Sequence, residues 1–188
     1  MTGRKLFYYL TPLIKILVYF FRLLPKFIRY FIWNISNVFE GKLSVLIRYV
    51  VLASLAKKVG KNIYVGKNVT IKNFESLILG SNISIHANCY IDASGGVNIG
   101  DNVSIAHNSS IISFEHTWEN LEVPIKYNPT ILKEVVIFKD VWIGCGVRVL
   151  AGVKINTRTI VAAGSVVKGL LDEKSIYAGV PAKKIRNI

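Results

Sequence analysis

The sequence predicts a parallel β-solenoid that follows a basic, apolar helical segment. Branched aliphatic residues recur at every sixth position without a break through Ile137, Ile143, Val149, Ile155, Val161 and Val167. A second series, with two extra residues around the Ser94–Gly96 turn, runs Leu79, Ile85, Ile91, Ile99, Ile105 and Ile111. A helix needs apolar positions every three to four residues and a half-buried strand every two. A period of six is what three short strands per coil require.

The positions between these anchors support the same fold. Four residues after the anchors, the side chains are small or branched, as at Ile83, Cys89, Val103, Val141, Val147, Val153, Thr159 and Ser165. Gly80, Gly100 and Gly144 each follow an anchor directly, where we expect a tight turn that leaves no room for a β-carbon. The alternative, a β-sandwich rich in Val and Ile, would show alternating patterns and variable spacing.

Residues 60–188 resemble the left-handed parallel β-helix acyltransferases, whose coils are built from hexapeptide repeats. The segment NCYIDASGGVNIGDNVSIAHNSSIISFEH is similar to sugar O-acetyltransferases of the maltose and galactoside type and to bacterial polysaccharide acetyltransferases. The later segment, from Asp140 to Arg186, is similar to the acetyl-CoA side of these enzymes. The resemblance implies a left-handed β-helix, acetyl-CoA as co-substrate, and a homotrimer with each active site between two subunits.

The chain divides into two predicted parts. Residues 1–58 form a basic, apolar helical segment that contacts a membrane surface and caps the first coil, and residues 59–188 form the β-helix acyltransferase domain. The repeats stop at Ile111 and resume at Ile137, so residues 112–136 are expected to protrude as a loop. A long loop inside a solenoid favours a functional role.

His116 stands at the base of this loop and is the predicted catalytic residue. The resemblance implies that a histidine in this place is the general base, and imidazole is suited near neutral pH to take the proton of an attacking sugar hydroxyl. Relatives often carry a second histidine where this chain has Phe114. The alternative is a surface histidine without a catalytic role.

The predicted acceptor-binding residues are His86, Asp92 and His107. His86 aligns with an asparagine that holds the acceptor sugar in the maltose-type relatives. Ile105 should stack over Ile85, so His86 and His107 should share one wall of adjacent coils, about 5–7 Å apart. The β-helix carbonic anhydrases bind zinc through three histidines, but the spacings here do not resemble theirs, and no metal is expected.

The resemblance also implies a set of cofactor-binding residues: Trp142, Gly144, Cys145, Ala163, Lys168, Lys183 and Arg186. The Cys145 backbone N–H would face the thioester, where a fixed donor stabilises developing negative charge. Ala163 matches a small residue beside the pantetheine arm. The three cations would bind the CoA phosphates, although each is also explained by simple solvation. The family often has Thr-Lys where this chain reads Lys168-Gly169.

The N-terminal segment carries the basic excess of the chain. Residues 1–60 hold ten Lys and Arg residues but a single acid, Glu40. On a helical wheel, at about 100° per residue, five cations share one stripe: Arg4, Lys15, Arg22, Lys26 and Arg29. Uncharged runs are too short to span a bilayer, and Pro12 and Pro25 should break or kink the helix. A second helix, about Leu43 to Ala56, should cap the first coil.

We interpret this segment as helices lying in the interface of an anionic membrane, cations toward the headgroups, rather than as a nucleic-acid site. Packing within an oligomer and a shallow re-entrant hairpin are alternatives. The lack of a cleavage site, with two cysteines outside any disulfide framework, favours the cytoplasm and the inner face of the cell membrane.

The leading hypothesis is an acetyl-CoA-dependent O-acetyltransferase that modifies a sugar hydroxyl of a bacterial surface polysaccharide or its lipid-linked precursor by direct transfer. A second hypothesis keeps the reaction but uses a small soluble acceptor, such as a sugar, an amino sugar, an amino acid or a xenobiotic. A third is a non-catalytic β-helix scaffold at the membrane.

Overall fold

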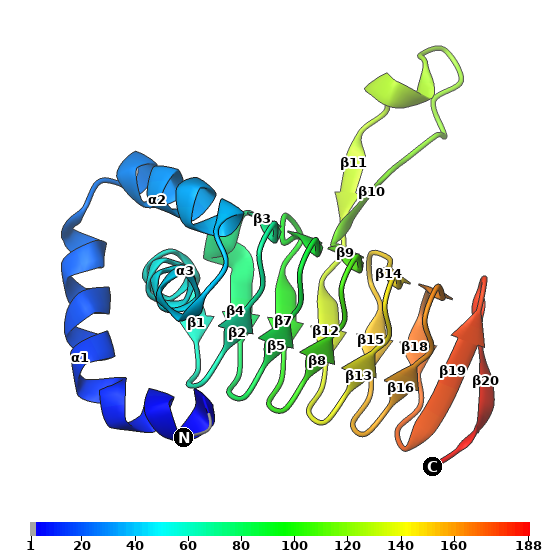
Figure 1. The fold of residues 1–188 in the computed structure, drawn as a ribbon. Helices are drawn as coiled ribbons and strands as arrows, with labels where there is room; N and C mark the ends of the chain where they lie inside the picture. The colour runs from blue at the N-terminus through cyan, green and yellow to red at the C-terminus, as the bar shows by residue number, and fades with distance from the viewer. Residues whose placement is uncertain (1–2) are drawn as a thin grey trace.

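A computed structural model describes the backbone of residues 3–188 and the side chains of residues 7–188. Three helices, α1 (Gly3–Leu23), α2 (Lys26–Val38) and α3 (Lys42–Leu55), precede the β-solenoid. Helices α1 and α2 bend around α3, which lies across the open end of the first coil (Figure 1). The chain then winds away from the helices, so that its C-terminus lies at the far end of the solenoid (Figure 1).

Three sheets form the faces of the solenoid, and all their strands pair in parallel except the last. Sheet A contains β1 (Lys58–Val59), β4 (Leu77–Leu79), β7 (Val97–Ile99), β12 (Val135–Ile137), β15 (Lys154–Ile155) and β18 (Leu170–Leu171). Sheet B contains β2 (Tyr64–Val65), β5 (Ser84–Ile85), β8 (Ser104–Ile105), β13 (Trp142–Ile143), β16 (Ile160–Val161), β19 (Ser175–Gly179) and the antiparallel β20 (Ala182–Asn187). Sheet C contains β3 (Thr70–Lys72), β6 (Tyr90–Asp92), β9 (Ser110–Ile112), β14 (Arg148–Val149) and β17 (Val166–Val167).

The predicted anchors form the core of the coils. Every anchor of both series is at most 1% exposed, and the small residues four positions later are buried as well. The predicted stacking of Ile105 over Ile85 is confirmed, and Ile143 and Val161 continue the same column. The six-residue period therefore places one apolar side chain per face inside each coil, and this core explains why the short strands are stable.

Glycine is needed after the anchors because neighbouring coils approach closely there. A β-carbon on Gly100 would lie 2.8 Å from the Lys139 nitrogen, and one on Gly144 would lie 2.6 Å from the Ala163 nitrogen. The left-handed turns are formed elsewhere, by other glycines and by asparagines, whose short side chains tolerate positive φ. Three of these form a hydrogen-bonded ladder along one corner, Asn62–Asn82–Asn102, with N···O distances of 2.8 and 3.1 Å.

Helix α3 is fixed to the first coil by a buried arginine. Arg48, only 1% exposed, donates to the backbone carbonyls of Ser36, Phe39 and Val65. Desolvation lowers the pKa of its guanidinium from the ordinary value. These bonds join the end of α2, the connection to α3 and strand β2, so the helices and the first coil form one packed unit.

The cations of the predicted basic stripe divide between solvent and contacts within the chain, and Lys15 is exposed. Arg22 and Arg29 donate to the carbonyls of Ala53 and Ser54, at 3.2 and 2.7 Å, at the C-terminal end of α3. Cations are stabilised there because the last carbonyls of a helix lack partners and carry partial negative charge. Lys26 turns toward Glu75 on the solenoid. The side chain of Arg4 lies outside the described side chains.

The apolar residues of α1 and α2 instead form the outer surface. Those that are about half exposed or more include Tyr9, Leu13, Ile16, Tyr19, Phe20, Leu23, Phe27, Phe31 and Val38. Pro25 separates the two helices, as predicted. Pro12 lies inside α1, and α1 bends in its N-terminal part (Figure 1). No helix in the described part of the chain is long and apolar enough to cross a bilayer.

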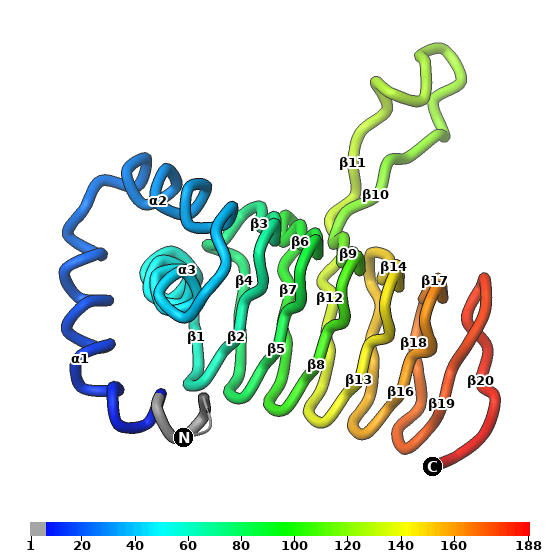
Figure 2. Tube along the Cα trace, viewed as in Figure 1, coloured from blue at the N-terminus to red at the C-terminus, as the bar shows by residue number. Residues whose placement is uncertain are grey.

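The stretch between the two repeat series protrudes from the solenoid, as Figure 2 shows. It leaves the turn after β9 as β10 (Phe114–His116), passes a short 3₁₀-helix at Ile125–Tyr127, and returns as β11 (Thr130–Leu132). Strands β10 and β11 pair in antiparallel fashion, with His116 opposite Thr130. The root of the loop is thus a two-stranded stem, which holds His116 at a defined height above the coils.

Candidate active site

The predicted residues lie on two corners of the solenoid and on the face of sheet B. The B–C corner consists of the turns that follow the strands of sheet B: residues 66–69, 86–89, 106–109, 144–147 and 162–165. The C–A corner consists of the turns that follow sheet C: residues 73–76, 93–96, 113–134, 150–153 and 168–169. The protruding loop belongs to the C–A corner.

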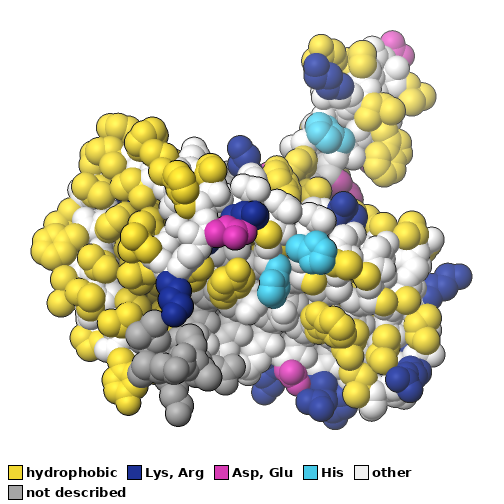
Figure 3. All heavy atoms as spheres, viewed as in Figure 1, with side chains coloured by type: hydrophobic (Ala, Val, Ile, Leu, Met, Phe, Trp, Pro, Cys, Tyr) yellow, Lys and Arg dark blue, Asp and Glu magenta, His cyan; other side chains and the backbone are white. Residues whose placement is uncertain are grey.

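The two acceptor-site histidines share the B–C corner. His86 donates its backbone N–H to the carbonyl of Ile105, and His107 comes two residues after Ile105 on the next coil. Both imidazoles are exposed, and Figure 3 shows two histidine side chains side by side while the third stands on the loop. The ring of Tyr64, one coil earlier, lies 5.6 Å from the ring of His86.

Cys145 and Ala163 continue the line of His107 along this corner. The N–H of Gly146 donates to the His107 carbonyl at 3.0 Å, and the N–H of Gly164 donates to the Cys145 carbonyl at 2.8 Å. The N–H of Cys145 itself, between two bonded neighbours, has no acceptor within the described residues. It is thus a fixed, unoccupied donor in the same column as His107 and next to Ala163.

Trp142 and the C-terminal cations lie on the adjoining face of sheet B. Trp142, 54% exposed, pairs with Ile160, which pairs in turn with Ile176 and then Arg186. Lys183 pairs with Ala178 on the same two-stranded end. Val147 is fully buried within its own coil.

His116 and Lys168 lie on the opposite side, at the C–A corner, and Asp92 ends strand β6 directly before this corner. Lys168 follows Val167, which stacks on Val149 and Ile111 of sheet C. It is therefore separated by the width of sheet C from Lys183 and Arg186, and the three predicted phosphate-binding cations do not meet within one chain. The His116 imidazole has no side-chain hydrogen bond among the described residues and lies 6.2 Å from the Phe114 ring.

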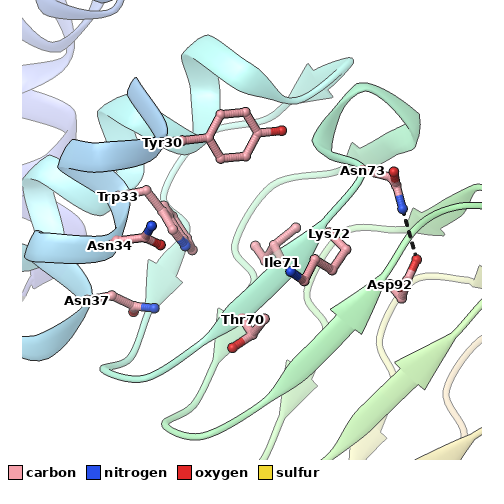
Figure 4. A pocket seen from close by; sticks show the side chains of 9 residues that line it. All are labelled: Tyr30, Trp33, Asn34, Asn37, Thr70, Ile71, Lys72, Asn73 and Asp92. Atoms are coloured by element: carbon pink, nitrogen blue, oxygen red, sulfur yellow. Dashed lines mark hydrogen bonds between the residues drawn. The ribbon is translucent and has the colours of Figure 1, made fainter. Parts of the chain in front are cut away.

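Asp92 lines a cleft of about 410 Å³ between α2 and the first strands of sheet C. Figure 4 shows Trp33, Asn34 and Asn37 on the helix side, facing the strands that carry Thr70 and Asp92. One carboxylate oxygen of Asp92 accepts bonds from Asn73 and from the Ser94 backbone N–H, each at 3.0 Å. The other accepts only from Tyr90, at 3.3 Å. Asp92 thus stabilises its own turn and retains one oxygen with capacity for a ligand.

Two features of the site were not predicted. The contact between Tyr64 and His86 was missed, because residue 64 lies outside both anchor series. The separation of Lys168 from the other cations was missed as well. The repeat register contained the information needed to predict this separation. Val161 belongs to the column of sheet B and Val167, which precedes Lys168, belongs to the column of sheet C.

The comparisons with known proteins identify the fold and the family. Residues 134–169 match the family model of the bacterial transferase hexapeptide, six repeats. A solved galactoside acetyltransferase in complex with coenzyme A superimposes with a TM-score of 0.77 at 26% identity, covering 86% of this chain and 80% of the other. The solenoid is that of the hexapeptide-repeat acetyltransferases. The predicted family resemblance and β-helix fold are confirmed.

Two curated relatives are each similar over about two-thirds of the chain. A Mycobacterium tuberculosis protein named as an acetyltransferase is 32% identical over 131 residues, which are 69% of this chain and 44% of that one. An Escherichia coli K12 protein named as an O-acetyl transferase of lipopolysaccharide biosynthesis is 30% identical over 125 residues, 66% of this chain and 57% of that one. The chain thus spans about half the length of these relatives.

Among the residues that the structure describes, no group of three or more His, Cys, Asp or Glu side chains could hold a metal ion. His116 stands on a different corner from His86 and His107, so the three histidines do not converge within one hexapeptide-repeat chain.

Proposed function

We propose that the protein is an acetyl-CoA-dependent O-acetyltransferase that modifies a sugar hydroxyl of a bacterial surface polysaccharide or its lipid-linked precursor. The observation that carries the proposal is the column of His107, Cys145 and Ala163, with the unoccupied Cys145 N–H aligned beside exposed imidazoles. The coenzyme A complex of a structural neighbour with the same fold supports the donor. The relative named for lipopolysaccharide biosynthesis supports the acceptor.

The reaction would proceed by direct transfer. The acceptor hydroxyl, held by His86 and His107, attacks the thioester carbonyl carbon while the His116 imidazole removes its proton. The Cys145 N–H donates to the oxyanion that develops on the carbonyl oxygen. Collapse of the tetrahedral intermediate breaks the C–S bond and forms the ester, and the proton taken by His116 passes to the departing CoA thiolate.

The division of these residues between two corners supports a site shared by two chains. His116 stands on the C–A corner and Cys145 on the B–C corner, and the six residues of a coil face span up to about 20 Å. Among the side chains that the structure describes, none forms a hydrogen bond with the His116 imidazole, and its ring neighbour is Phe114. In a homotrimer the loop of one subunit would bring His116 to the B–C corner of its neighbour.

The helical end supports a membrane location for the enzyme. The outer faces of α1 and α2 present a continuous apolar surface, visible as the predominantly hydrophobic left side of Figure 3. Since Arg22 and Arg29 are used to cap α3, contact with lipid would rest mainly on the aromatic and aliphatic side chains. An enzyme that modifies a lipid-linked glycan needs to work at such a surface.

The proposal is tested by thiol release from acetyl-CoA in the presence of membrane-extracted lipid-linked glycans. Substitution His116→Ala should slow release by about 10²–10⁴-fold, the usual contribution of a general base. The matched control is Glu119→Gln, an exposed substitution on the same loop, which should retain activity. Release with soluble sugars alone would favour a small soluble acceptor, and the absence of any acetyl-CoA binding or turnover would favour a scaffold.

A further inference from the structure

A second, larger cleft lies between the helices and the first coil. It has a volume of about 680 Å³, within the range of small-molecule sites. Its walls come from one face of α1, the N-terminal half of α3 and the first turns of the solenoid. The apolar side chains that line it are Phe7, Leu10, Ile14, Leu43, Val45, Leu46, Tyr49 and Ile63. The interior is thus suited to an apolar ligand.

One end of this cleft reaches the B–C corner. Tyr64, Lys67 and Ala87 line that end, and the Tyr64 ring lies 5.6 Å from the ring of His86. The carbonyl of Lys67 accepts from the N–H of Asn88, and the carbonyl of Ala87 from that of Asn108. Lys67 and Ala87 therefore begin the column that continues through His107 and Cys145.

The order of residues along the corner distinguishes the two substrates. The cleft opens at Lys67 and Ala87, His107 follows, and Cys145 comes next, with coils about 4.8 Å apart. A donor thioester at Cys145 would be separated from the cleft by the acceptor histidines. A chain that occupies the cleft would therefore belong to the acceptor rather than to the acyl group of the donor.

The charged residues that line the cleft favour a ligand with an anionic head group. Lys42 and Lys67 line the cleft together with a single acid, Glu40, which pairs with Lys67 at 2.7 Å. Arg48 belongs to the wall, where three backbone carbonyls already accept its bonds. A phosphate at the mouth would replace Glu40 as the partner of Lys67 and would also reach Lys42.

We propose that this cleft binds the isoprenoid or acyl chain of an amphiphilic acceptor, with its phosphate at Lys42 and Lys67 and its sugar at His86 and His107. The inference rests on the proposed function and narrows its acceptor to a lipid-linked phosphosugar. The apolar outer surface of α1 adjoins the helix face that forms the cleft, so the chain would pass from the bilayer to the site along apolar surface.

A binding experiment tests the cleft without catalysis. The probe is a dansyl-labelled decyl phosphate titrated against wild type, Leu46→Trp and Ile16→Trp. Leu46 lines the cleft, whereas Ile16 is 53% exposed on the outer side of α1 and provides the matched control. Binding should weaken by at least about tenfold in Leu46→Trp, because several buried methylenes are displaced, and should be unchanged in Ile16→Trp.

Leu43→Trp, a cleft residue that is 70% exposed, repeats the test with little risk to folding. Equal probe binding by wild type and both cleft variants would overturn the inference, and so would loss of binding in Ile16→Trp alone.

A kinetic arm separates this inference from the proposed function. Methyl and octyl glycosides of one sugar are compared as acceptors in the thiol-release assay. We expect the octyl compound to show a KM at least about tenfold lower in wild type, with the difference abolished in Leu46→Trp. Equal KM values for the two glycosides, with robust turnover, would refute chain binding in the cleft but would leave the proposed acetyltransferase activity supported. Probe binding to the cleft without turnover of any acceptor would refute the acetyltransferase instead.

Discussion

The glycines of the coils are required for two different physical reasons. Gly100 is required by the approach of the next coil rather than by its own dihedral angles, since a β-carbon there would meet the backbone of Lys139 at 2.8 Å and of Phe138 at 2.9 Å. Gly164 is required by its dihedral angles instead, because its φ is +70° and nothing lies within 4 Å of an added β-carbon. The two glycines should therefore respond differently to substitution.

We predict that Gly100→Ala destabilises the protein by about 1–3 kcal/mol, the usual cost of overpacking a rigid site. Gly164→Asn should cost less than about 1 kcal/mol, because asparagine tolerates positive φ. Thermal and urea unfolding of both variants measure the difference. A neutral Gly100→Ala would mean that the coils separate easily, which would contradict the observed packing.

The two cysteines should differ in reactivity. Burial raises the pKa of the Cys89 thiol, so the thiol stays protonated. The same burial keeps reagents away from it. Cys145 is partly exposed, so iodoacetamide at pH 8 should label it first, as peptide mass analysis would show. If Cys145 lies beside the cofactor, acetyl-CoA at ten times its Kd should slow this labelling by about tenfold. A labelling rate that is the same with and without acetyl-CoA would mean that Cys145 does not lie in the cofactor site.

At the scale of the elements, the solenoid was predictable and the helices only partly so. Each coil repeats the same local requirement, an apolar anchor and a small residue at a fixed spacing, so the pattern identifies the core residues by counting. Helix α3 was predicted within a residue of its observed ends. The orientation of α1 and α2 was not predicted, because it depends on a tertiary partner. The carbonyls at the end of α3 attract Arg22 and Arg29, and helical periodicity carries no information about them.

The outward apolar face of α2 leads to a prediction about membrane contact. Phe27 and Phe31 are 72% and 63% exposed, and replacing both with glutamate should lower binding to phosphatidylglycerol vesicles by at least about tenfold, because two large apolar groups are lost. The matched control is Leu121→Glu with Leu170→Glu, which changes two leucines outside the helices that are 90% and 62% exposed. Co-sedimentation measures binding. Equal loss in both double variants would indicate a charge effect rather than insertion of this face.

At the scale of the whole molecule, the candidate site is incomplete in one chain. His116 and Lys168 belong to the C–A corner, whereas Cys145, Ala163 and the cations of β20 belong to the B–C side. Residue counting from the anchors assigns each of them to a corner, but it does not say which corners meet. We propose that the assembly supplies this information and that contact between copies completes the active site.

A shared site makes a prediction that single variants cannot test. His116→Ala disables the loop corner, and Ala163→Trp blocks the B–C corner at an exposed small residue, so each variant alone should be inactive. When the two are co-expressed with different tags and mixed trimers are isolated, some sites combine an intact loop with an intact B–C corner. Each mixed trimer then has one intact site, so about a third of the sites are restored, and thiol release from acetyl-CoA should recover to about a third of the wild-type level. Mixed trimers without activity would mean that each chain builds its site alone, with the loop folding back across sheet C.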